Sequence, residues 1–440
     1  MRIAFVSPKG VFFSNEPRLM RFWEKSKENL GSKLLATQFD LWSGFNLGLL
    51  ILAALTPKKY EIEFIDENLK DINFEKHYDL VAISAITQQS IRAYQIADEF
   101  RKRKIKVVIG GIHATVLPDE AKQHADSIVI GEGEYSWPSL MKDLRKGELL
   151  PFYRSKESVD LKYSPLPRYN LLNPRDYRIV WIQTSRGCPF DCEFCAASKV
   201  FGLKFRHKTV KRVLQEIKLI KSIWKNPQIN FSDDNMFIDR KYAEELIKEL
   251  IPLNIRWAAS TDISIAKDDK LLELLRKSGC IVLFIGFESL SKESLKNIDK
   301  RSWKLSQLSN YSLYIKKIQS YGIGVMGAFI LGLDNDDKSI FGKTADFIIN
   351  NHLYAAQITV LTPLPGTRLR ERLNKEKRLL CHSWEKYSFL DVNFIPQKMS
   401  IKELQNGILQ VYQRVYAKSV KIKTAEYFKN IYLDLLKNRK

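Results

Sequence analysis

Cysteine is scarce in this sequence and unevenly placed: the chain of 440 residues has 5 cysteines, and three of them lie between positions 188 and 195. This distribution does not suit a disulfide framework and favours a reducing compartment. Long apolar runs are also missing. The longest one near the start, LGLLILAAL at 47–55, is far shorter than the roughly 20 residues that span a bilayer. No signal peptide precedes the strand-like RIAFVSP, so we expect a cytoplasmic protein.

Acidic residues are outnumbered, since 71 Lys and Arg against 50 Asp and Glu give a net charge of +21. Such an excess can attract nucleic acid, an anionic membrane surface or an anionic substrate. The lysines are spread over predicted helical surfaces, which favours a solvated surface and leaves a polyanionic partner as the second interpretation. With 45% hydrophobic and 28% charged residues, the chain is typical of a soluble globular protein of about three domains.

Residues 1–145 alternate short apolar runs with helical patterns, which predicts parallel βαβ units. We therefore expect an α/β fold with a doubly wound, Rossmann-like sheet, whose ligands lie at the carboxyl ends of the strands. The predicted strands are Ile3–Val6, Glu61–Asp66, Leu80–Ser84, Lys106–Gly110 and Ser127–Ile130. The predicted helices are Leu47–Leu55, Ile91–Lys102, Pro118–His124 and Ser136–Arg145.

Glycines and turn-forming residues follow several of these strands, in GGIHAT after the fourth and GEGE after the fifth. They let the backbone approach a large ligand closely, but glycines in such places also simply form turns. The residues alone leave both possibilities open. A G-x-G-x-x-G fingerprint is missing from the first turn, which disfavours a nicotinamide cofactor.

The remaining chain divides into three parts. Residues 146–178 have four prolines and no steady periodicity, which predicts a surface linker. Residues 179–365 return to strand and helix alternation and predict a partial (β/α)6 version of the eight-stranded barrel. Residues 366–440 are predicted to be mainly helical, ending in an amphipathic segment that packs on the barrel or contacts a membrane surface. The predicted barrel strands are Val180–Thr184, Gln228–Phe231, Arg256–Ser260, Ile281–Gly286, Ile323–Phe329 and Ala356–Leu361.

Cys188, Cys192 and Cys195 have the spacing C-x3-C-x2-C directly after the first predicted barrel strand. Three thiolates on one loop can hold an iron–sulfur cluster and leave one iron without a protein ligand. A structural zinc site would need a fourth ligand, and the nearest histidine has no partner pattern. The other two cysteines differ, because Cys280 suits a buried apolar position and Cys381 has no recognisable role.

This cysteine spacing, with Phe194 before the last cysteine, resembles the radical S-adenosylmethionine family. The resemblance implies a 4Fe-4S cluster that cleaves S-adenosylmethionine reductively to a 5′-deoxyadenosyl radical, with an electron donor such as flavodoxin or ferredoxin. Motifs at the strand ends match the family's positions for S-adenosylmethionine. The matching residues are Phe194, Asp233, Asp234, Asn235, Ser260, Asp262, Glu288, Gly327, Gly332, Asp334 and Pro363. From the residues alone, the acidic pair at 233–234 suits a helix cap as well as a methionyl amine.

The first part of the chain resembles the cobalamin-binding domain that precedes the catalytic domain in one class of these enzymes. The resemblance rests on WSGFNLGLLILAALTP, EIEFIDEN, DLVAISAITQQ, VVIGGIHAT and DSIVIGEGE. The positions carried over to cobalamin are Ser84, Thr87, Gly110, Gly111, Gly131 and Glu132. One motif departs from other cobalamin proteins: SPKGVFF follows the first strand in place of D-x-H-x-x-G. The resemblance therefore implies a cobalamin without a histidine ligand, and gives His113 a lining or supporting position.

Together the two resemblances imply an enzyme that methylates an unactivated carbon of a small-molecule, lipid or peptide substrate. The segment WEKYSFLDVNFIPQKMS resembles the C-terminal domain of some members, including hopanoid methylases. An alternative keeps both cofactors but catalyses a rearrangement, cyclisation or oxidation without methyl transfer.

Two alternatives come from other classes. An RNA-modifying radical enzyme is disfavoured, because the extra cysteines of methylthiotransferases and a recognisable RNA-binding module are both missing. A non-enzymatic cobalamin sensor would leave the three clustered cysteines without a purpose.

Overall fold

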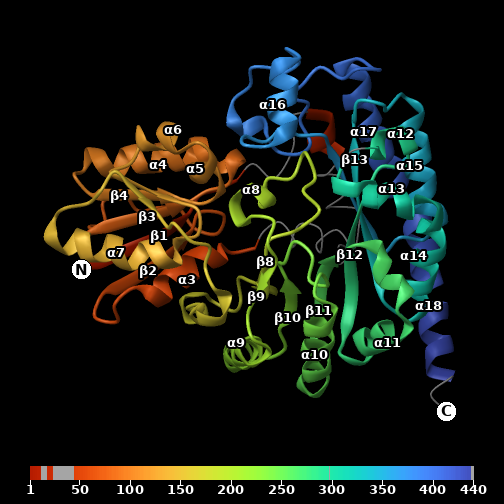
Figure 1. The fold of residues 1–440 in the computed structure, drawn as a ribbon, viewed down its shortest axis with the longest axis horizontal. Helices are drawn as coiled ribbons and strands as arrows, with labels where there is room; N and C mark the ends of the chain where they lie inside the picture. The colour runs from red at the N-terminus through yellow and green to blue at the C-terminus, as the bar shows by residue number, and fades with distance from the viewer. Residues whose placement is uncertain (11–16, 23–43, 297, 438–440) are drawn as a thin grey trace.

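The computed structural model describes residues 1–10, 17–22, 44–296 and 298–437. Two parallel sheets with helices packed against them lie side by side, the first in orange and the second in green to blue (Figure 1). This confirms the predicted α/β fold with a parallel half-barrel. Two residues of the run that begins WSGF, Trp42 and Ser43, lie outside the described residues, as do residues 11–13 of SPKGVFF.

The first sheet has the strand order β2-β1-β3-β4-β5-β6, and all neighbours are parallel. Its strands are β1 (Arg2–Ser7), β2 (Glu61–Asp66), β3 (Leu80–Ser84), β4 (Lys106–Gly110), β5 (Ser127–Ile130) and β6 (Phe152–Arg154). The five predicted strands are confirmed. Strand β6 was not predicted, because it lies in the segment 146–178 that we assigned to a linker. Only Tyr153 of its three residues is buried, and so short a pattern gives no usable periodicity. The domain limits at 145 and 178 stay predictions.

Alternating side chains of this sheet enter two cores. Phe5 packs on the face covered by α3 and α7, whereas its neighbour Ala4 packs on the face covered by α4, α5 and α6. This alternation follows from the period of two in a strand. The helices are α3 (Leu47–Leu55), α4 (Ser90–Lys102), α5 (Ile112–Val116), α6 (Pro118–Lys122) and α7 (Gly133–Lys146). Helix α5 was not predicted, since it is only one turn long.

The second sheet has the order β14-β13-β12-β11-β10-β7, again parallel throughout. Its end strands do not pair with each other in the described part of the chain, so the sheet stays an open half-barrel. The strands are β7 (Ile179–Ile182), β10 (Gln228–Phe231), β11 (Arg256–Thr261), β12 (Cys280–Glu288), β13 (Gly324–Leu331) and β14 (Ala355–Val360). Its covering helices are α9 (Val210–Ile223), α10 (Arg240–Leu250), α11 (Asp269–Lys277), α14 (Tyr311–Ser320) and α15 (Ser339–Asn350).

Shorter elements follow the carboxyl ends of the barrel strands. They are the antiparallel ladder of β8 (Ser185–Arg186) with β9 (Arg206–His207), and the short helices α8 (Ala197–Phe201), α12 (Lys292–Leu295) and α13 (Trp303–Gln307). In Figure 1, α8 lies in the space between the two sheets. Cys280, at the start of β12, is 5% exposed, so the buried position predicted for it is confirmed.

The last part of the chain is less helical than predicted. It contains α16 (Arg368–Lys375), α17 (Ile401–Val415) and α18 (Lys418–Lys437), but between α16 and α17 only the short turn η8 (Trp384–Lys386) and one isolated bridge interrupt the loop. The hydroxyl of Tyr412 in α17 donates to the carbonyl of Ile358 at 2.6 Å, which fixes this helix on β14. None of the described helices is both long and apolar enough to cross a membrane.

The two sheets share one apolar core. Phe45, just before α3, packs edge-on against Tyr169 and Tyr177. All three side chains belong to the same apolar cluster as the core of the barrel. The hydroxyl of Tyr177 also donates to Asp66 at the end of β2, at 2.9 Å. Because this core is continuous, the carboxyl edges of both sheets are held near each other.

Candidate functional site

The three cysteines line one cavity at the carboxyl ends of the barrel strands. Cys188, Cys192 and Cys195 are half-buried free thiols on the loop between β8 and β9, and the cavity has a volume of about 410 Å³. The loop turns at Gly187 (φ +91°), where a Cβ atom would lie 2.2 Å from the carbonyl oxygen of Lys204. Glycine is therefore required at the point where the loop leaves its ladder.

The chemistry of these thiols fits an iron–sulfur cluster. Burial raises the pKa of Cys188 to about 11 and also raises the pKa values of Cys192 and Cys195, so the thiols need a metal charge to become thiolates. No group of three His, Cys, Asp or Glu side chains is already gathered as metal ligands within the described ranges. The shared cavity and the spacing, not preformed coordination geometry, therefore support the cluster.

Asp233 braces the start of the cysteine loop. It is 2% exposed, and its Oδ1 accepts hydrogen bonds from the backbone N–H groups of Thr184 at 2.7 Å and Ser185 at 2.9 Å. The hydroxyl of Thr184 donates to its other oxygen. Burial raises the pKa of Asp233, and these hydrogen bonds oppose the rise. Its neighbour Asp234 is exposed within the cavity and has a backbone hydrogen bond from Gly187, so this second carboxylate keeps accepting positions for a cationic ligand.

A buried ion pair closes the opposite wall. Lys304 Nζ lies 2.9 Å from Glu288 Oε1 and donates to the carbonyl of Gly286 at 2.8 Å. Burial, the largest single effect, lowers the pKa of Lys304, but the charges of Glu288 and Cys192 and the hydrogen bond to Glu288 together raise it above its usual value. Glu288 itself has a left-handed backbone (φ +63°), which costs about 1–3 kcal/mol for a residue with a side chain. Such strain at a cavity wall indicates a functional constraint on its orientation.

Most of the residues predicted to bind S-adenosylmethionine are brought together here. The cavity is lined by Phe194, Asp233, Asp234, Asn235, Ser260, Asp262 and Glu288. Four others are not in its lining, namely Gly327, Gly332, Asp334 and Pro363.

Local structure explains why these four residues do not line the cavity. In β13, Ala328 and Ile330 face the cavity, so strand alternation turns Gly327 toward the covering side chains Phe287 and Phe329. Asp334 is instead paired with Arg372 and Arg378, each at 2.6 Å. The N–H of Gly332 donates to Asp336, and the carbonyl of Pro363 accepts from Arg370.

A second cavity, of about 260 Å³, lies at the carboxyl edge of the first sheet. Of the positions predicted for cobalamin, Ser84, Gly110, Gly111, Gly131 and Glu132 line it. Thr87 does not, because it is buried in the turn η1 (Thr87–Gln89).

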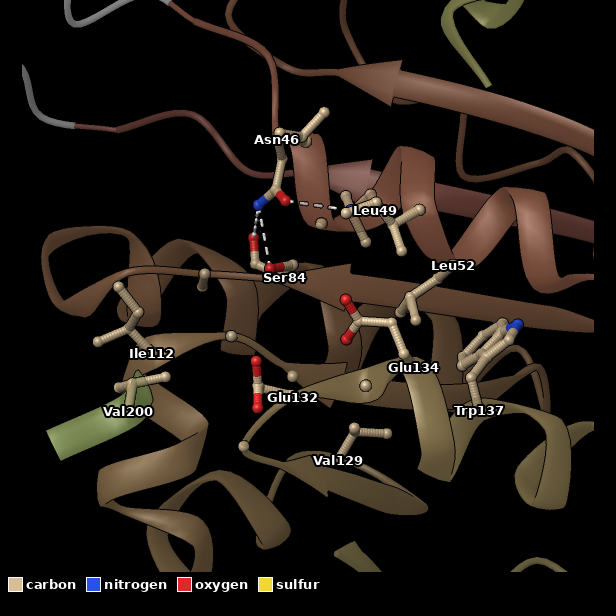
Figure 2. Close-up of a pocket in the computed structure, with 18 of the residues that line it drawn as sticks. Asn46, Leu49, Leu52, Ser84, Ile112, Val129, Glu132, Glu134, Trp137 and Val200 are labelled. Atoms are coloured by element: carbon tan, nitrogen blue, oxygen red, sulfur yellow. Dashed lines mark hydrogen bonds between the residues drawn. The ribbon is translucent and has the colours of Figure 1, made fainter. Parts of the chain in front are cut away.

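Figure 2 shows how the wall of this second cavity is built. The Nδ2 of Asn46 donates to Ser84 Oγ at 3.0 Å, while its Oδ1 caps α3 by accepting from Leu49 N at 3.2 Å. Val200, from α8 of the barrel side, points toward Ile112 of α5, which packs on the first sheet. Both units therefore contribute to one cavity.

The lining of the second cavity fits a large corrinoid. Its surface is mainly apolar, with Leu52, Ile112 and Val129 among the side chains, and a Cβ at Gly131 would meet no atom within 4 Å. Backbone at the strand ends can thus approach a flat ligand closely. No histidine is among the described residues of the lining. His113 lies deeper, 1% exposed, with its Nε2 3.2 Å from Glu120 and its ring edge-on to Trp384.

The two cavities are adjacent. Ser232 lines the second cavity and the next residue, Asp233, lines the first. Sequence reasoning did not find Arg186 or Lys304, since charged residues are frequent throughout the chain and only the fold brings these two to the cavities. Asn46 did carry a signal, because Asn immediately before an apolar helical run is a common N-cap.

Comparisons with known protein families match the same two regions. Residues 182–348 match the model of the radical SAM superfamily, and residues 42–140 match the B12 binding domain. Residues 367–437 match a domain of unknown function, DUF4070.

Similar proteins cover most of the chain. Bacteriochlorophyllide d C-12(1)-methyltransferase from Chlorobaculum tepidum is 31% identical over 86% of this chain and 84% of its own length. An anaerobic magnesium-protoporphyrin IX monomethyl ester cyclase from Cereibacter sphaeroides is 26% identical over 88% of this chain and 68% of its own length. Among solved structures, the radical S-adenosylmethionine methyltransferase TsrM from Kitasatospora setae, with cobalamin and a 4Fe-4S cluster bound, has a TM-score of 0.67. It is 14% identical, over 94% of this chain and 89% of its own.

Replacing Cys188 by Ala is expected to abolish cluster binding, because a cluster held by two thiolates loses a third of its protein ligands. After anaerobic reconstitution, iron and sulfide content and the visible absorbance of the cluster should fall to near the background level. Cys381→Ala is the control, since this cysteine is exposed and outside the cavity lining. Full iron content in the Cys188→Ala variant would exclude the assigned ligand set.

Replacing Gly110 by Leu is expected to block corrinoid binding with little effect on the sheet. A Cβ at Gly110 would lie 3.6 Å from Val129, an ordinary contact, but the rest of the side chain takes up space in the cavity. Cobalamin affinity, measured by equilibrium dialysis, should fall at least about tenfold, roughly 1.4 kcal/mol. The control is Gly342→Leu on α15, where a Cβ would meet only Arg414 at 4.0 Å. Equal affinity of the two variants would exclude this cavity as the site.

Proposed function

The chain belongs to the radical SAM superfamily and carries a B12-binding domain, and from that premise we propose that it is a methyltransferase acting on an unactivated carbon. The observation that carries the proposal is the proximity of the two cavities, whose linings contain the consecutive residues Ser232 and Asp233. Adjacent cofactor cavities suit a reaction in which a carbon radical is made on one side and receives a group from the other.

The cofactors are a 4Fe-4S cluster, S-adenosylmethionine and cobalamin. When bound, they supply the electron for cleavage of S-adenosylmethionine, the adenosyl radical that removes a hydrogen atom, and the methyl group. In our proposal Cys188, Cys192 and Cys195 hold the cluster. The exposed carboxylate of Asp234 orients the methionyl ammonium, and Asp233 keeps the loop in place. Apolar walls exclude water from the radical.

We further propose that the substrate enters the half-barrel with an apolar body. A third hollow inside the barrel shares Ser260, Phe284 and Gln357 with the cysteine cavity. Its other walls are largely apolar, with Val282 and Met326 among them. An uncharged ring or chain of carbon suits such a surface.

Two buried polar atoms of this hollow, Trp181 Nε1 and Asn230 Oδ1, have no hydrogen-bond partner among the described residues. Asn230 is 3% exposed. A buried carboxamide oxygen without a partner costs about 1–3 kcal/mol, so a hydrogen-bond donor on the substrate would offset this cost. We assign Asn230 the role of contacting one polar substituent of an otherwise apolar substrate.

A second candidate function is ring closure without methyl transfer. The cyclase from Cereibacter sphaeroides matches 88% of this chain, a share similar to the 86% that the Chlorobaculum tepidum methyltransferase matches. The adjacent cavities would also serve ring closure. Both functions take a small-molecule substrate and an external reductant, for which we propose flavodoxin or ferredoxin. A lipid fits the apolar hollow better than a peptide, and nothing here favours nucleic acid. A cytoplasmic location and a peripheral membrane contact of α18 stay predictions.

The deciding experiment is anaerobic reconstitution with iron, sulfide and cobalamin, followed by assay with S-adenosylmethionine and a reductant. Bacteriochlorophyllide d and magnesium-protoporphyrin IX monomethyl ester, named for two relatives, are the first substrates to test. A methyltransferase should form methylated product, 5′-deoxyadenosine and S-adenosylhomocysteine in equal amounts. Product with 5′-deoxyadenosine but without S-adenosylhomocysteine would establish the cyclase-type alternative. Absence of any S-adenosylmethionine cleavage would exclude both.

Asn230→Leu is expected to weaken the use of substrate without lowering the thermal stability of the protein. Because the Asn230 oxygen has no partner to lose, the midpoint of thermal unfolding should stay the same or rise. The value of kcat/KM for an accepted substrate should fall about tenfold, the worth of one hydrogen bond to a buried polar group.

The matched control for this variant is Asn351→Leu. Asn351 is also buried, at 6% exposed, but its side chain donates to the carbonyl of Phe347 at 2.8 Å. This variant should lower the unfolding midpoint and leave substrate selectivity unchanged. A destabilised Asn230→Leu enzyme with unchanged kcat/KM would contradict the assigned role.

A further inference from the structure

The loop that carries the three cysteines is closed at its base by the ladder of β8 with β9. In this ladder Arg186 and Arg206 stand directly opposite each other. Like charges in directly opposed positions repel and weaken a two-stranded pair. The base of the loop thus depends on carboxylates from elsewhere in the molecule.

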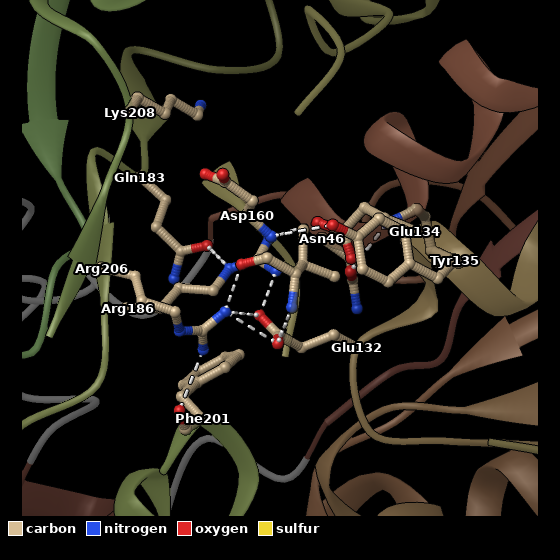
Figure 3. Close-up of polar contacts among 12 residues, drawn as sticks. Asn46, Glu132, Glu134, Tyr135, Asp160, Gln183, Arg186, Phe201, Arg206 and Lys208 are labelled. Atoms are coloured by element: carbon tan, nitrogen blue, oxygen red, sulfur yellow. Dashed lines mark hydrogen bonds and ion pairs between the residues drawn. The ribbon is translucent and has the colours of Figure 1, made fainter. Parts of the chain in front are cut away.

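Those carboxylates come from the first sheet. Glu132 and Glu134 belong to the GEGE segment that follows β5. This segment lines the second cavity, at the carboxyl edge of the first sheet, which we call the corrinoid cavity. Arg186 donates to Glu132 at 2.6 Å and to Glu134 at 2.7 Å, and Arg206 Nη1 lies 2.9 Å from Glu132 Oε2. Figure 3 shows the two guanidinium groups meeting at Glu132. We call these four residues the ionic bridge.

The ionic bridge is buried and balanced in charge. The exposed fractions of its side chains are 6% for Arg186, 6% for Glu132, 8% for Glu134 and 12% for Arg206. Two cations and two anions cancel, so the cluster tolerates burial, whereas loss of one member leaves a buried charge without a partner. The two sheets already share a continuous apolar core, and the first sheet has a second core on its other face, so neither needs these charges for its own strands to form.

Residues of the ionic bridge also form part of the wall of the corrinoid cavity. The guanidinium carbon of Arg186 lies 5.6 Å from the ring centre of Phe201, and Arg206 Nη2 donates to the Phe201 carbonyl at 2.9 Å. Phe201 lines the corrinoid cavity, as do Arg186 and Glu132 themselves. Glu132 further accepts from the N–H of Val159 at 2.9 Å in the segment that joins the two sheets.

We propose that the ionic bridge is a positioning device that holds the corrinoid cavity at a set distance and angle from the cysteine loop. The inference rests on the proposed two-cofactor reaction, and it makes Arg186, Glu134 and Glu132 positioning residues. Glu132, which the family resemblance assigns to cobalamin contact and which lines the corrinoid cavity, also joins the two units. A radical made at one cavity then meets the methyl donor in the other before it is lost by side reactions.

The test uses Glu134→Gln, with Arg186→Gln as a second, stronger variant, in the full-length protein. The matched control is Glu216→Gln, which breaks another buried ion pair, with Lys208 at 2.6 Å. Both members of that pair belong to the barrel unit. Glutamine can keep Oε1 as the acceptor for the Tyr169 hydroxyl, which binds there at 2.7 Å, so this variant removes a buried ion pair without changing a contact of residues 131–135. If Arg186→Gln does not fold, Glu134→Gln alone decides, because it keeps Glu132 with both arginines.

Two readouts do not depend on methylation. In the cofactor-free protein, amide hydrogen exchange should rise together at residues 131–135 and 183–187 in Glu134→Gln, whereas Glu216→Gln should leave 131–135 unchanged. In the reconstituted protein, magnetic broadening of the Co(II) signal by the reduced cluster, measured by electron paramagnetic resonance, should weaken in Glu134→Gln only. Broadening equal to that of the wild type would overturn the proposal.

The functional readout is the ratio of 5′-deoxyadenosine to methylated product at matched iron and cobalamin content. This ratio should be near one in the wild type and in Glu216→Gln, and it should rise at least fivefold in Glu134→Gln. An unchanged ratio would make the ionic bridge merely structural. If the wild type forms no S-adenosylhomocysteine, the proposed methylation fails, while the magnetic broadening still decides on the bridge.

Discussion

Both sheets of this protein are parallel, and the position of every functional group depends on that constraint. In a parallel sheet each strand must return through a helix, so all loops that follow the strands emerge at one edge. The first sheet presents its glycine-rich turns there, and the second presents the cysteine loop and the polar residues after β10, β11 and β12. A shared apolar core through Phe45, Tyr169 and Tyr177 holds the two edges near each other.

Buried charge is concentrated where these edges meet. Lys304 pairs with Glu288 beside the cysteines, and the ionic bridge lies between the cavities. Removing charges from water costs several kcal/mol per ion, so well-packed apolar residues could stabilise the fold as effectively. Ion pairs instead restrict orientation, because a guanidinium group donates short hydrogen bonds to a carboxylate in only a few geometries. Electrostatics in this protein therefore orients parts that the apolar core has already brought together.

Differences between expectation and structure follow one rule, namely that local patterns predict elements but not their neighbours. The alternation of short apolar runs with helical patterns was enough to predict five strands of the first sheet and six of the second, yet the three-residue β6 was assigned to a linker. Position 327 was expected at the cavity from its motif, but the alternation of β13 puts Ala328 there instead. Asp334 was assigned to cofactor binding, although two arginines from beyond the barrel engage its carboxylate.

The sequence by itself determined the class of fold, and it predicted the three cysteine ligands and the strand ends at which ligands are expected, because periodicity and spacing are properties of neighbouring residues. Only the tertiary structure decided which carboxylates remain free. Asp233 and Asp234 are adjacent in sequence, yet Asp233 accepts hydrogen bonds from the backbone at the start of the cysteine loop, whereas Asp234 is exposed to the cavity. Likewise Glu132 meets Arg186 and Arg206 across two sheets. The strength of a charge depends on its burial and its partners, and both are set by chain segments far away in sequence.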